Sequence, residues 1–316
     1  MRIVIPGGSG YLGTELARSF AADGHEVVVL TRHPTHRSPW REVAWDGKTA
    51  GPWVAELEGA DAVVNLAGRS VNCRYTKGNL REMMDSRIDS TRAVGQAISR
   101  VRTPPAVWLQ MSTATIYAHR FDAANDEGTG VLGGSEPDAP ALWRASIDIA
   151  KAWEQTHIAA QTPSTRKVQL RAAMVMGSAP GGPFDLLARL CAFGLGGPLA
   201  GGAQYISWIH QRDFVRAVKF LIGRRDLSGP FNLAAPNPLP QREFMAELRA
   251  ACGKRLGLPA GKWMLEIGSF LLRTETELIL KSRRVVPTRL LQAGFRFEFP
   301  EWPAAVRSLV ARRVAA

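Results

Sequence analysis

The chain has 316 residues, of which 46% are hydrophobic and 22% charged, and its net charge at pH 7 is +12. This length allows one large α/β domain with a smaller one, and no apolar run reaches the roughly 18 residues of a membrane helix. Residues 242–316 hold 14 basic and 7 acidic side chains, without the interleaved aromatic residues of a stacking surface. Binding to nucleic acid or to a membrane is therefore not expected.

The three cysteines, Cys73, Cys191 and Cys252, lie far apart and lack the spacing of metal ligands. This pattern is typical of reduced thiols, and no metal site is predicted. The chain starts directly with an apolar strand and shows no charged-then-apolar leader, so we expect a cytoplasmic protein.

The first 30 residues predict a strand at 2–5, a glycine turn, an amphipathic helix from about Tyr11 and a second strand at 27–30. The turn has the dinucleotide spacing Gly8-x-Gly10-x-x-Gly13. Its glycines allow a tight turn, a close approach of the backbone to a pyrophosphate, and close packing of helix on strand. The helix would direct its N–H groups and positive dipole end at the phosphates. The residues predicted to contact this part of the cofactor are Gly7, Gly8, Ser9, Gly10, Tyr11, Leu12 and Gly13.

The tip of the second strand predicts which dinucleotide is bound. An acidic residue there would favour NAD, but the chain reads Thr31-Arg32 and has no carboxylate before Glu42. An arginine at this point can pair with the 2′-phosphate of NADP(H). NADP(H) is therefore the expected cofactor, and a solvated surface arginine is the alternative.

Strands and helices continue to alternate as far as residue 235. Apolar strands are expected at 61–66, 106–111 and 167–170, with helices at about 77–100 and 142–160. This alternation predicts an α/β fold with a Rossmann-type, doubly wound parallel sheet and a smaller, mostly helical C-terminal domain. We expect residues 1–235 to bind the cofactor, residues 176–210 to contribute to a substrate lid, and residues 236–316 to form a substrate-side domain.

Several motifs together resemble a known superfamily. They are the glycine turn, Asn65-Leu66-Ala67-Gly68, Ser112 to Tyr117, Asp85 to Thr91, Gly194 to Leu199, Ser207 to His210, and Ser282 to Pro287 with Ala293 to Phe295. The chain resembles the extended short-chain dehydrogenases/reductases, which include NAD(P)-dependent epimerases and dehydratases. More narrowly, it is similar over its whole length to an atypical epimerase-family branch, the 39U type with its own C-terminal domain.

The resemblance implies further cofactor contacts. Thr31 and Arg32 would meet the adenosine ribose and its 2′-phosphate, and Asp46 the adenine amine. The remaining implied contacts are Leu66, Ala67, Gly68, Glu82 and Arg87. The alternatives are an ordinary turn aspartate for Asp46 and a helix-surface pair for Glu82 and Arg87.

Active members of this superfamily use a Tyr-x-x-x-Lys pair with a Ser or Thr, and this chain lacks the tyrosine. On the helix expected at 142–160, one register places Ile147 and Lys151 at the two positions, and the other places Ser146 and Ala150 there. Neither register restores the pair that would transfer a proton.

Two residues near the fifth strand are candidate catalytic groups, namely Thr113 as the hydroxyl residue and Tyr117 as a substitute for the missing tyrosine. A packed aromatic is the alternative for Tyr117. His210 is a further acid or base candidate, with a structural histidine favoured. Arg171, Arg283 and Arg284 would bind a substrate phosphate if they faced the cleft.

Two functional hypotheses follow. The first is an NADP(H)-dependent oxidoreductase or epimerase that acts on a small, possibly nucleotide-linked substrate through an altered relay, with turnover that falls when Thr113 or Tyr117 is changed. The second is a catalytically inactive NADP(H)-binding regulatory or interaction protein. A monomer or a homodimer is expected, the latter through the helices at 77–100 and 142–160.

Overall fold

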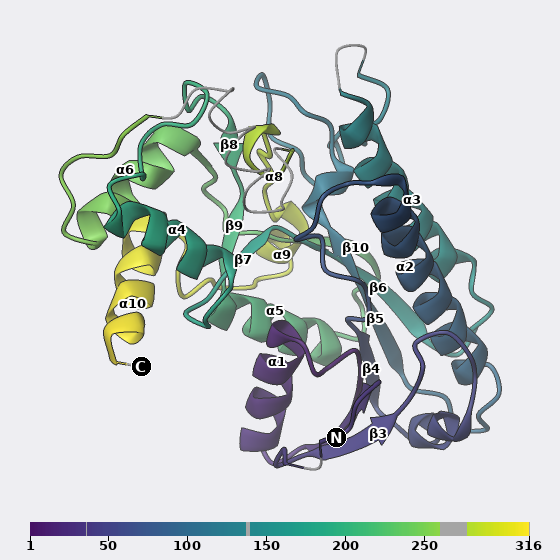
Figure 1. The fold of residues 1–316 in the computed structure, drawn as a ribbon. Helices are drawn as coiled ribbons and strands as arrows, with labels where there is room; N and C mark the ends of the chain where they lie inside the picture. Colours follow the sequence, from purple (N-terminus) through teal and green to yellow (C-terminus); the bar gives the residue numbers. More distant parts are fainter. Residues whose placement is uncertain (36, 137–139, 260–276, 316) are drawn as a thin grey trace.

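A sheet of seven strands lies at the centre of the protein (Figure 1). The computed structural model describes residues 1–35, 37–136, 140–259 and 277–315. The strands are β1 (Arg2–Pro6), β2 (Glu26–Thr31), β3 (Arg41–Ala44), β4 (Ala62–Asn65), β5 (Val107–Thr113), β6 (Arg166–Ala172) and β10 (Gly229–Leu233). All neighbouring strands are parallel, in the order β10-β6-β5-β4-β1-β2-β3. The strand order reverses between β1 and β4, which confirms the predicted Rossmann-type, doubly wound sheet.

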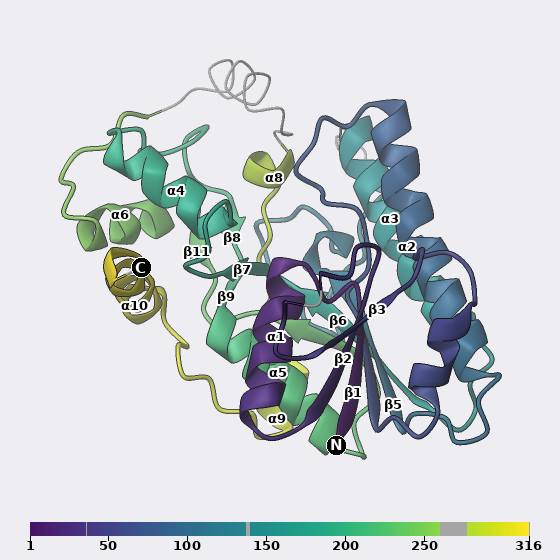
Figure 2. The same ribbon diagram turned by 60° about the horizontal axis from the view of Figure 1, so that its bottom comes forward.

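Helices cover both faces of this sheet (Figures 1 and 2). The four main ones are α1 (Tyr11–Ala22), α2 (Lys77–Ile98), α3 (Ala141–Ala159) and α5 (Gln211–Gly223). Leu16 of α1 and Phe214 of α5 join Ile5 of β1 in one apolar cluster, whereas Val94 of α2 joins Val4 of β1 in another. Successive β1 residues thus face opposite layers, as the pleat of a strand requires, and both faces of the sheet are buried.

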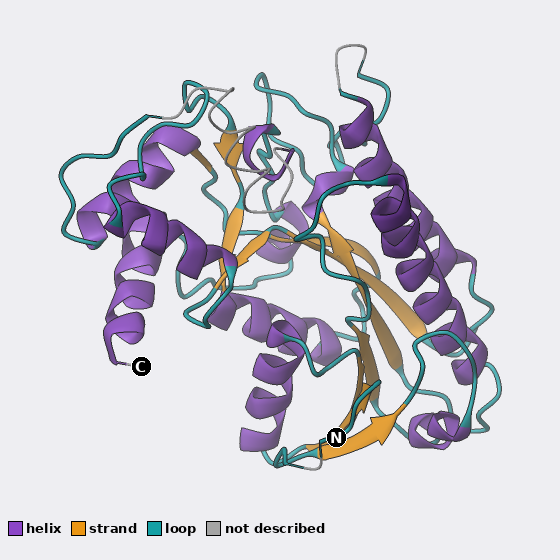
Figure 3. Cartoon of the chain, in the orientation of Figure 1, coloured by secondary structure: helices purple, strands orange, loops and turns teal. Residues whose placement is uncertain are grey.

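A third group of helices packs beside the sheet domain (Figure 3). It contains α4 (Pro183–Ala192), α6 (Gln241–Ala251) and α10 (Trp302–Ala315), and it is joined to the sheet domain through the short strands β7 (Met174–Met176), β8 (Tyr205–Ile206), β9 (Trp208–His210) and β11 (Leu239–Pro240). Trp302 is fully buried, and its ring stacks on Phe244 at a centroid distance of 4.0 Å. Trp208 packs against the same indole ring at 5.0 Å. These aromatic contacts hold the group together.

The segment after residue 276 contributes to both parts of the molecule. The short helix α8 (Glu277–Leu280) lies near the N-terminal part of α3, where Glu277 contacts Ser146. Helix α9 (Thr288–Gln292) packs against β10. Leu290 and Phe295 belong to the apolar cluster of the sheet domain, whereas Trp302 belongs to the third group. The chain therefore runs along the β10 edge of the sheet before it reaches the third group of helices.

Candidate functional site

The glycine turn connects β1 to α1, and each of its glycines has a different local environment. Gly7 has a φ of +74°, and a Cβ on it would lie 2.7 Å from the backbone of Ala67. A Cβ on Gly13 would collide with the backbone of Gly8, which itself lies close against Ile5. Gly10 is different, because the nearest atom to a Cβ there is 3.8 Å away. A side chain at Gly7, Gly8 or Gly13 would collide with neighbouring protein atoms, whereas one at Gly10 would not.

A cavity of about 560 Å³, here called the turn cavity, opens above this turn. Gly10 is the N-cap of α1 and provides no side chain to cap the helix, so the first N–H groups of α1 are left for another acceptor. The sequence-predicted residues that line the turn cavity are Gly7, Ser9, Gly10, Thr31, Arg32, Asp46, Leu66, Ala67, Gly68 and Glu82. Gly8 and Gly13 lie behind the turn, and Tyr11 and Leu12 face a second cavity.

Basic side chains lie at the β2 end of the turn cavity. Thr31 donates a hydrogen bond to Ser9 Oγ at 3.1 Å, which ties the strand tip to the glycine turn. Arg32 is exposed and, within the described ranges, has no hydrogen-bond or ion-pair partner. Lys48 lines the same cavity and was not predicted from the sequence. An anion placed here would meet two cationic side chains.

Asp46 lines the turn cavity while stabilising a local turn. Its carboxylate accepts hydrogen bonds from the Thr49 hydroxyl at 2.6 Å and from the Lys48 and Thr49 backbone N–H groups at 2.8 Å. These bonds, with the Thr49 hydroxyl as the largest contributor, lower the pKa of Asp46. Asp46 therefore stabilises a local turn, which is the alternative given above. Its side chain also lines the part of the turn cavity that the resemblance assigns to the adenine.

A second cavity of about 450 Å³, here called the inner cavity, adjoins the turn cavity through Leu66, Gly68, Arg69 and Ser70, which line both. It lies at the carboxyl ends of β4, β5 and β6, where ligands of open α/β sheets bind. Thr113 lines it, as predicted, and the Thr113 Oγ1 accepts a hydrogen bond from Thr115 N at 3.1 Å. Together the two cavities form one groove from the tip of β2 to Thr113.

Arg87 of α2 lies in the wall of the inner cavity and is 9% exposed. Its guanidinium donates to Met83 O at 3.0 Å and lies over the Trp153 ring at 4.8 Å. No Asp or Glu of the described residues is within ion-pair distance of it, and burial lowers its pKa to about 10. A buried cation without a carboxylate partner is costly unless a ligand supplies the negative charge. Glu82, by contrast, is exposed at the rim of the turn cavity and pairs with Arg69.

The structure distinguishes the two registers of helix α3. Ser146 and Ala150, one of the two predicted registers, line the inner cavity. In the other register, Ile147 is fully buried elsewhere, and Lys151 Nζ donates to Gly133 O at 2.5 Å outside the cavity. Of the two registers, only the one with a hydroxyl and a methyl group faces the cavity.

Tyr117 does not reach either cavity. Its ring is 2% exposed, its hydroxyl donates to Asn232 Oδ1 at 2.9 Å, and it accepts from Arg171 Nη1 at 2.9 Å. Burial raises the pKa of Tyr117. Arg171 is itself held by Glu154 at 2.8 Å, in a pair that the Ser112 hydroxyl joins. This geometry argues against Tyr117 as a catalytic residue and against Arg171 as a phosphate ligand, and it favours the packed aromatic.

His210 is also held in the core. Its Nδ1 accepts a hydrogen bond from Arg212 N at 3.1 Å, so that it caps α5, and its ring stacks on Phe299 at 4.0 Å. Burial lowers its pKa to about 3. It lines neither cavity. The geometry agrees with the structural alternative.

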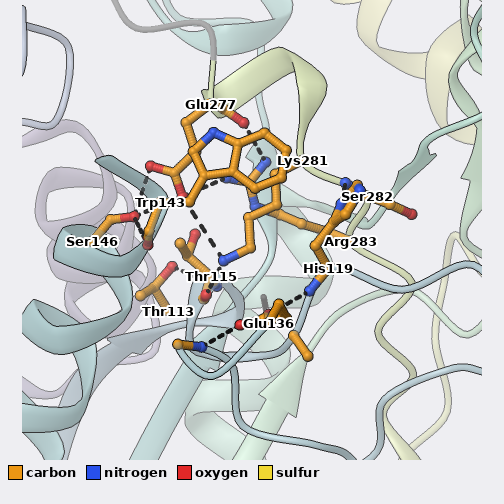
Figure 4. A network of polar contacts seen from close by, with 12 residues as sticks. Thr113, Thr115, His119, Glu136, Trp143, Ser146, Glu277, Lys281, Ser282 and Arg283 are labelled. Atoms are coloured by element: carbon orange, nitrogen blue, oxygen red, sulfur yellow. Dashed lines mark hydrogen bonds and ion pairs between the residues drawn. The ribbon is translucent and has the colours of Figure 1, made fainter. Parts of the chain in front are cut away.

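The inner end of the inner cavity contains a polar cluster that the sequence analysis largely missed (Figure 4). Glu277 of α8 accepts hydrogen bonds from the Ser146 hydroxyl at 2.6 and 2.7 Å, and lies 3.8 Å from Lys281 Nζ. Lys281 donates to Thr115 O at 2.9 Å, and both Lys281 and Arg283 line the cavity. Of the three arginines proposed for a phosphate, Arg283 faces the cavity, and Arg284 stacks on Tyr205 and does not line it.

Cationic side chains predominate at the inner cavity. Its described lining includes Arg69, Arg87, Lys281 and Arg283. The Glu277 carboxylate adjoins this lining, 3.8 Å from Lys281 Nζ and 3.9 Å from Arg283 Nη2. No group of three or more His, Cys, Asp or Glu in the described ranges is arranged to hold a metal ion. In the same ranges, none of the helices combines the length and the apolar character needed to span a membrane.

Comparisons with known proteins identify the relatives of this chain. The model of the NAD dependent epimerase/dehydratase family matches residues 3–234, and a domain of unknown function, DUF1731, matches residues 260–309. The human epimerase family protein SDR39U1 is 30% identical and covers 98% of this chain and 100% of its own length. The Bacillus subtilis epimerase family protein YfhF is 28% identical, with 99% of each chain covered. The crystal structure of human SDR39U1 (isoform 2) with NADPH matches with a TM-score of 0.85 and 28% identity, over 98% of this chain and 99% of that one.

Proposed function

Because this chain belongs to the NAD-dependent epimerase/dehydratase family, we propose that it binds NADPH and acts as an oxidoreductase or epimerase on a small substrate. The observation that carries this proposal is the continuous groove formed by the turn cavity and the inner cavity. It runs from the basic side chains at the tip of β2, past the glycine turn, to the hydroxyls of Thr113 and Ser146. A dinucleotide in this groove would have one end beside a cavity large enough for a small molecule.

The residues of the turn cavity fit a dinucleotide. The open space at Gly10 and the uncapped N-terminus of α1 suit a pyrophosphate. The neighbouring segment Leu66 to Gly68 passes its backbone along the same groove, and it is held by a hydrogen bond from Ala67 N to Asn65 Oδ1 at 3.1 Å. Arg87 supplies a buried positive charge farther inside.

The tip of β2 supports NADPH over NADH. Arg32 has no partner of its own within the described ranges, and Lys48 lines the same end of the cavity. Two cations suit a 2′-phosphate, and an acidic residue that would bind a ribose 2′-hydroxyl is missing from the strand tip. The similar human protein was crystallised with NADPH, which supports the same choice.

The chain's own residues would bind and orient the substrate. Bound NADPH supplies a hydride. Thr113 offers its hydroxyl group to a substrate oxygen, and Ser146 uses its hydroxyl to hold Glu277. The segment after residue 276 closes the inner end of the cavity with Lys281 and Arg283. The predicted substrate-side region, residues 236–316, would thus contribute directly to substrate binding. The positive lining suits a substrate that carries a negative charge or a strongly polar oxygen.

A second candidate function is an NADPH-binding protein without turnover. One observation favours it, because the residues of α3 that face the inner cavity, Ser146 and Ala150, include neither the tyrosine that moves a proton in the superfamily nor the lysine that supports it. The inner cavity, at the end of the groove where the nicotinamide would lie, has no role in this alternative. We therefore prefer the enzyme.

A titration of the purified protein with NADPH and with NADH, followed by nicotinamide fluorescence, tests the proposal. We expect NADPH to bind more tightly, and Arg32→Ala to raise its Kd about 10- to 100-fold, since hydrogen bonds to charged groups contribute about 1.5–3 kcal/mol. Binding of NADH should change less than twofold in the same variant. Arg100→Ala, an exposed arginine outside both cavities, is the matched control. A wild-type protein that binds neither nucleotide contradicts the proposal.

A further inference from the structure

The inner cavity contains a lysine although helix α3 does not place one there. Ala150, at the lysine position of one predicted register, faces the cavity, and Lys151 points to Gly133 O instead. Lys281 reaches the same cavity from the segment that follows α8, some 130 residues later in the chain. A lysine thus reaches the cavity from a segment other than α3.

The ammonium of Lys281 is held in a defined position. Its side chain is buried, it donates to Thr115 O at 2.9 Å, and Glu277 Oε1 lies 3.8 Å away (Figure 4). Glu277 is fixed in turn by the Ser146 hydroxyl at 2.6 and 2.7 Å. An ammonium has three N–H donors, and Thr115 O uses one of them. Glu277 lies near a second donor, and the third has no acceptor among the described residues, although the side chain itself is fully buried within the cavity lining.

The charged groups around Lys281 come from three neighbouring segments. Arg283 and Glu277 flank it on its own segment, Glu136 lies on the loop before α3, and His119 lies after β5. Burial is the largest influence and, with the positive charge of Arg283, outweighs the two carboxylates, so that the pKa of Lys281 falls to about 8. The amine is therefore able to give and take a proton near neutral pH.

We propose that Lys281 is a catalytic residue that donates a proton to the oxygen of a small aldehyde or ketone bound in the inner cavity, with Glu277 as its positioning residue. This inference rests on the proposed function. Bound NADPH supplies the hydride to the carbonyl carbon. One N–H bond of Lys281 breaks and leaves its electron pair on Nζ, and an O–H bond forms on the substrate, which becomes an alcohol. The neutral amine regains its proton from water that enters the cavity when the product leaves.

Lys151 provides a matched control for Lys281. Both lysines donate a hydrogen bond to a backbone carbonyl, of Gly133 and of Thr115 respectively, but Lys151 does not line either cavity. Replacing each by Met removes the same ammonium and the same kind of bond. A purely structural role predicts a loss of stability in each variant, larger for Lys281→Met because that variant removes a cation beside the buried Glu277, and no specific effect on chemistry. A proton donor predicts a defect in kcat that is confined to Lys281→Met.

The first experiment measures NADPH oxidation with a panel of small aldehydes and ketones between pH 6 and 10. For a carbonyl that the wild type reduces, we expect kcat to fall at least 100-fold in Lys281→Met, with the Kd of NADPH within twofold of the wild type. Lys281→Arg keeps the positive charge but cannot release a proton at these pH values, so it should be equally slow. Since the acid must be protonated, the wild-type rate should decrease as the pH rises through about 8.

Each other outcome contradicts a specific claim. Lys281→Met or Lys281→Arg with kcat within threefold of the wild type overturns the inference, and so does an equal loss in Lys151→Met. A wild type that binds NADPH but reduces no carbonyl of the panel overturns this inference and leaves the cofactor proposal standing. A wild type that does not bind NADPH overturns both.

A second readout does not depend on turnover. In protein produced with ¹³C-labelled lysine, the ¹³Cε signal of each lysine follows the protonation of its unmodified amine. We expect one signal, absent from Lys281→Met, to titrate near pH 8, while the signals of exposed lysines titrate near their ordinary value. Addition of NADPH should shift that signal. A Lys281 signal that titrates with the exposed lysines and does not respond to NADPH overturns the inference.

Discussion

The turn cavity and the inner cavity differ in what their walls are made of. The lining of the turn cavity includes the glycine turn and the residues directly after β2 and β4, where Gly7, Gly10 and Gly68 present backbone without a side chain. The inner cavity is lined by side chains from segments far apart in sequence, among them Arg87, Thr113, Ser146 and Lys281. Backbone walls suit a ligand part that every relative must bind, and side-chain walls can change with the reaction.

The difference also concerns how each wall is held in place. Gly13 packs directly on Gly8, so close backbone contacts fix the turn. The wall behind Thr113 is fixed by a buried network in which Arg171 bridges Glu154 and Tyr117. The two cavities should therefore respond differently to substitution, and three predictions test this, from the largest expected effect on free energy to the smallest.

Arg171→Met should have the largest effect. Both side chains of the Arg171–Glu154 pair are less than one tenth exposed, so the variant leaves a buried carboxylate with only the Ser112 hydroxyl as a partner. Breaking a buried ion pair on one side costs about 3–5 kcal/mol of unfolding free energy. Urea denaturation of the wild type and the variant measures the difference.

The double variant Arg171→Met with Glu154→Leu provides the control, because it removes both charges. It should be more stable than Arg171→Met alone, since no carboxylate is then buried without its cation. A single variant within about 1 kcal/mol of the wild type would show that this network does not fix the inner wall.

Gly13→Ala and Gly10→Ala should separate stability from binding in the turn. At Gly13 a Cβ meets the backbone of Gly8, so we expect a loss of about 1–3 kcal/mol in unfolding free energy. At Gly10 a Cβ has no protein atom nearer than 3.8 Å, so stability should change by less than about 1 kcal/mol. The methyl group at Gly10 would instead occupy space intended for the pyrophosphate, and the affinity for NADPH should fall at least tenfold. Denaturation and fluorescence titration measure the two quantities, and an unchanged NADPH affinity in Gly10→Ala contradicts the pyrophosphate assignment.

The contrast between contiguous and distant segments also explains which site residues could be predicted from the sequence. The glycine turn and Arg32 belong to contiguous segments with a fixed relation between spacing and structure, so they could be placed in the groove before the fold was known. The register of α3 remained open, because Lys151 and Ser146 lie on different sides of one helix and only packing decides which side faces the cavity. Lys281 could not be assigned at all, since its distance from Thr115 depends on how the segment after residue 276 crosses the sheet. Tyr117 looked catalytic from its position after β5, but its hydroxyl is held by Asn232 and Arg171, which are remote in sequence.

Thr113 and Tyr117 provide the smallest and most specific test, since the sequence analysis named both as catalytic candidates. Thr113 lines the inner cavity, so Thr113→Val should lower kcat for NADPH oxidation about tenfold, which corresponds to about 1.4 kcal/mol, while Thr113→Ser should retain activity. Tyr117→Phe should cost about 1 kcal/mol of unfolding free energy through its two lost hydrogen bonds and leave kcat within twofold of the wild type. Steady-state kinetics on each folded variant separates the two residues. If Tyr117→Phe lowers kcat as much as Thr113→Val does, the buried network around Tyr117 takes part in the reaction. The residues behind the inner cavity could then no longer be separated in function from those that line it.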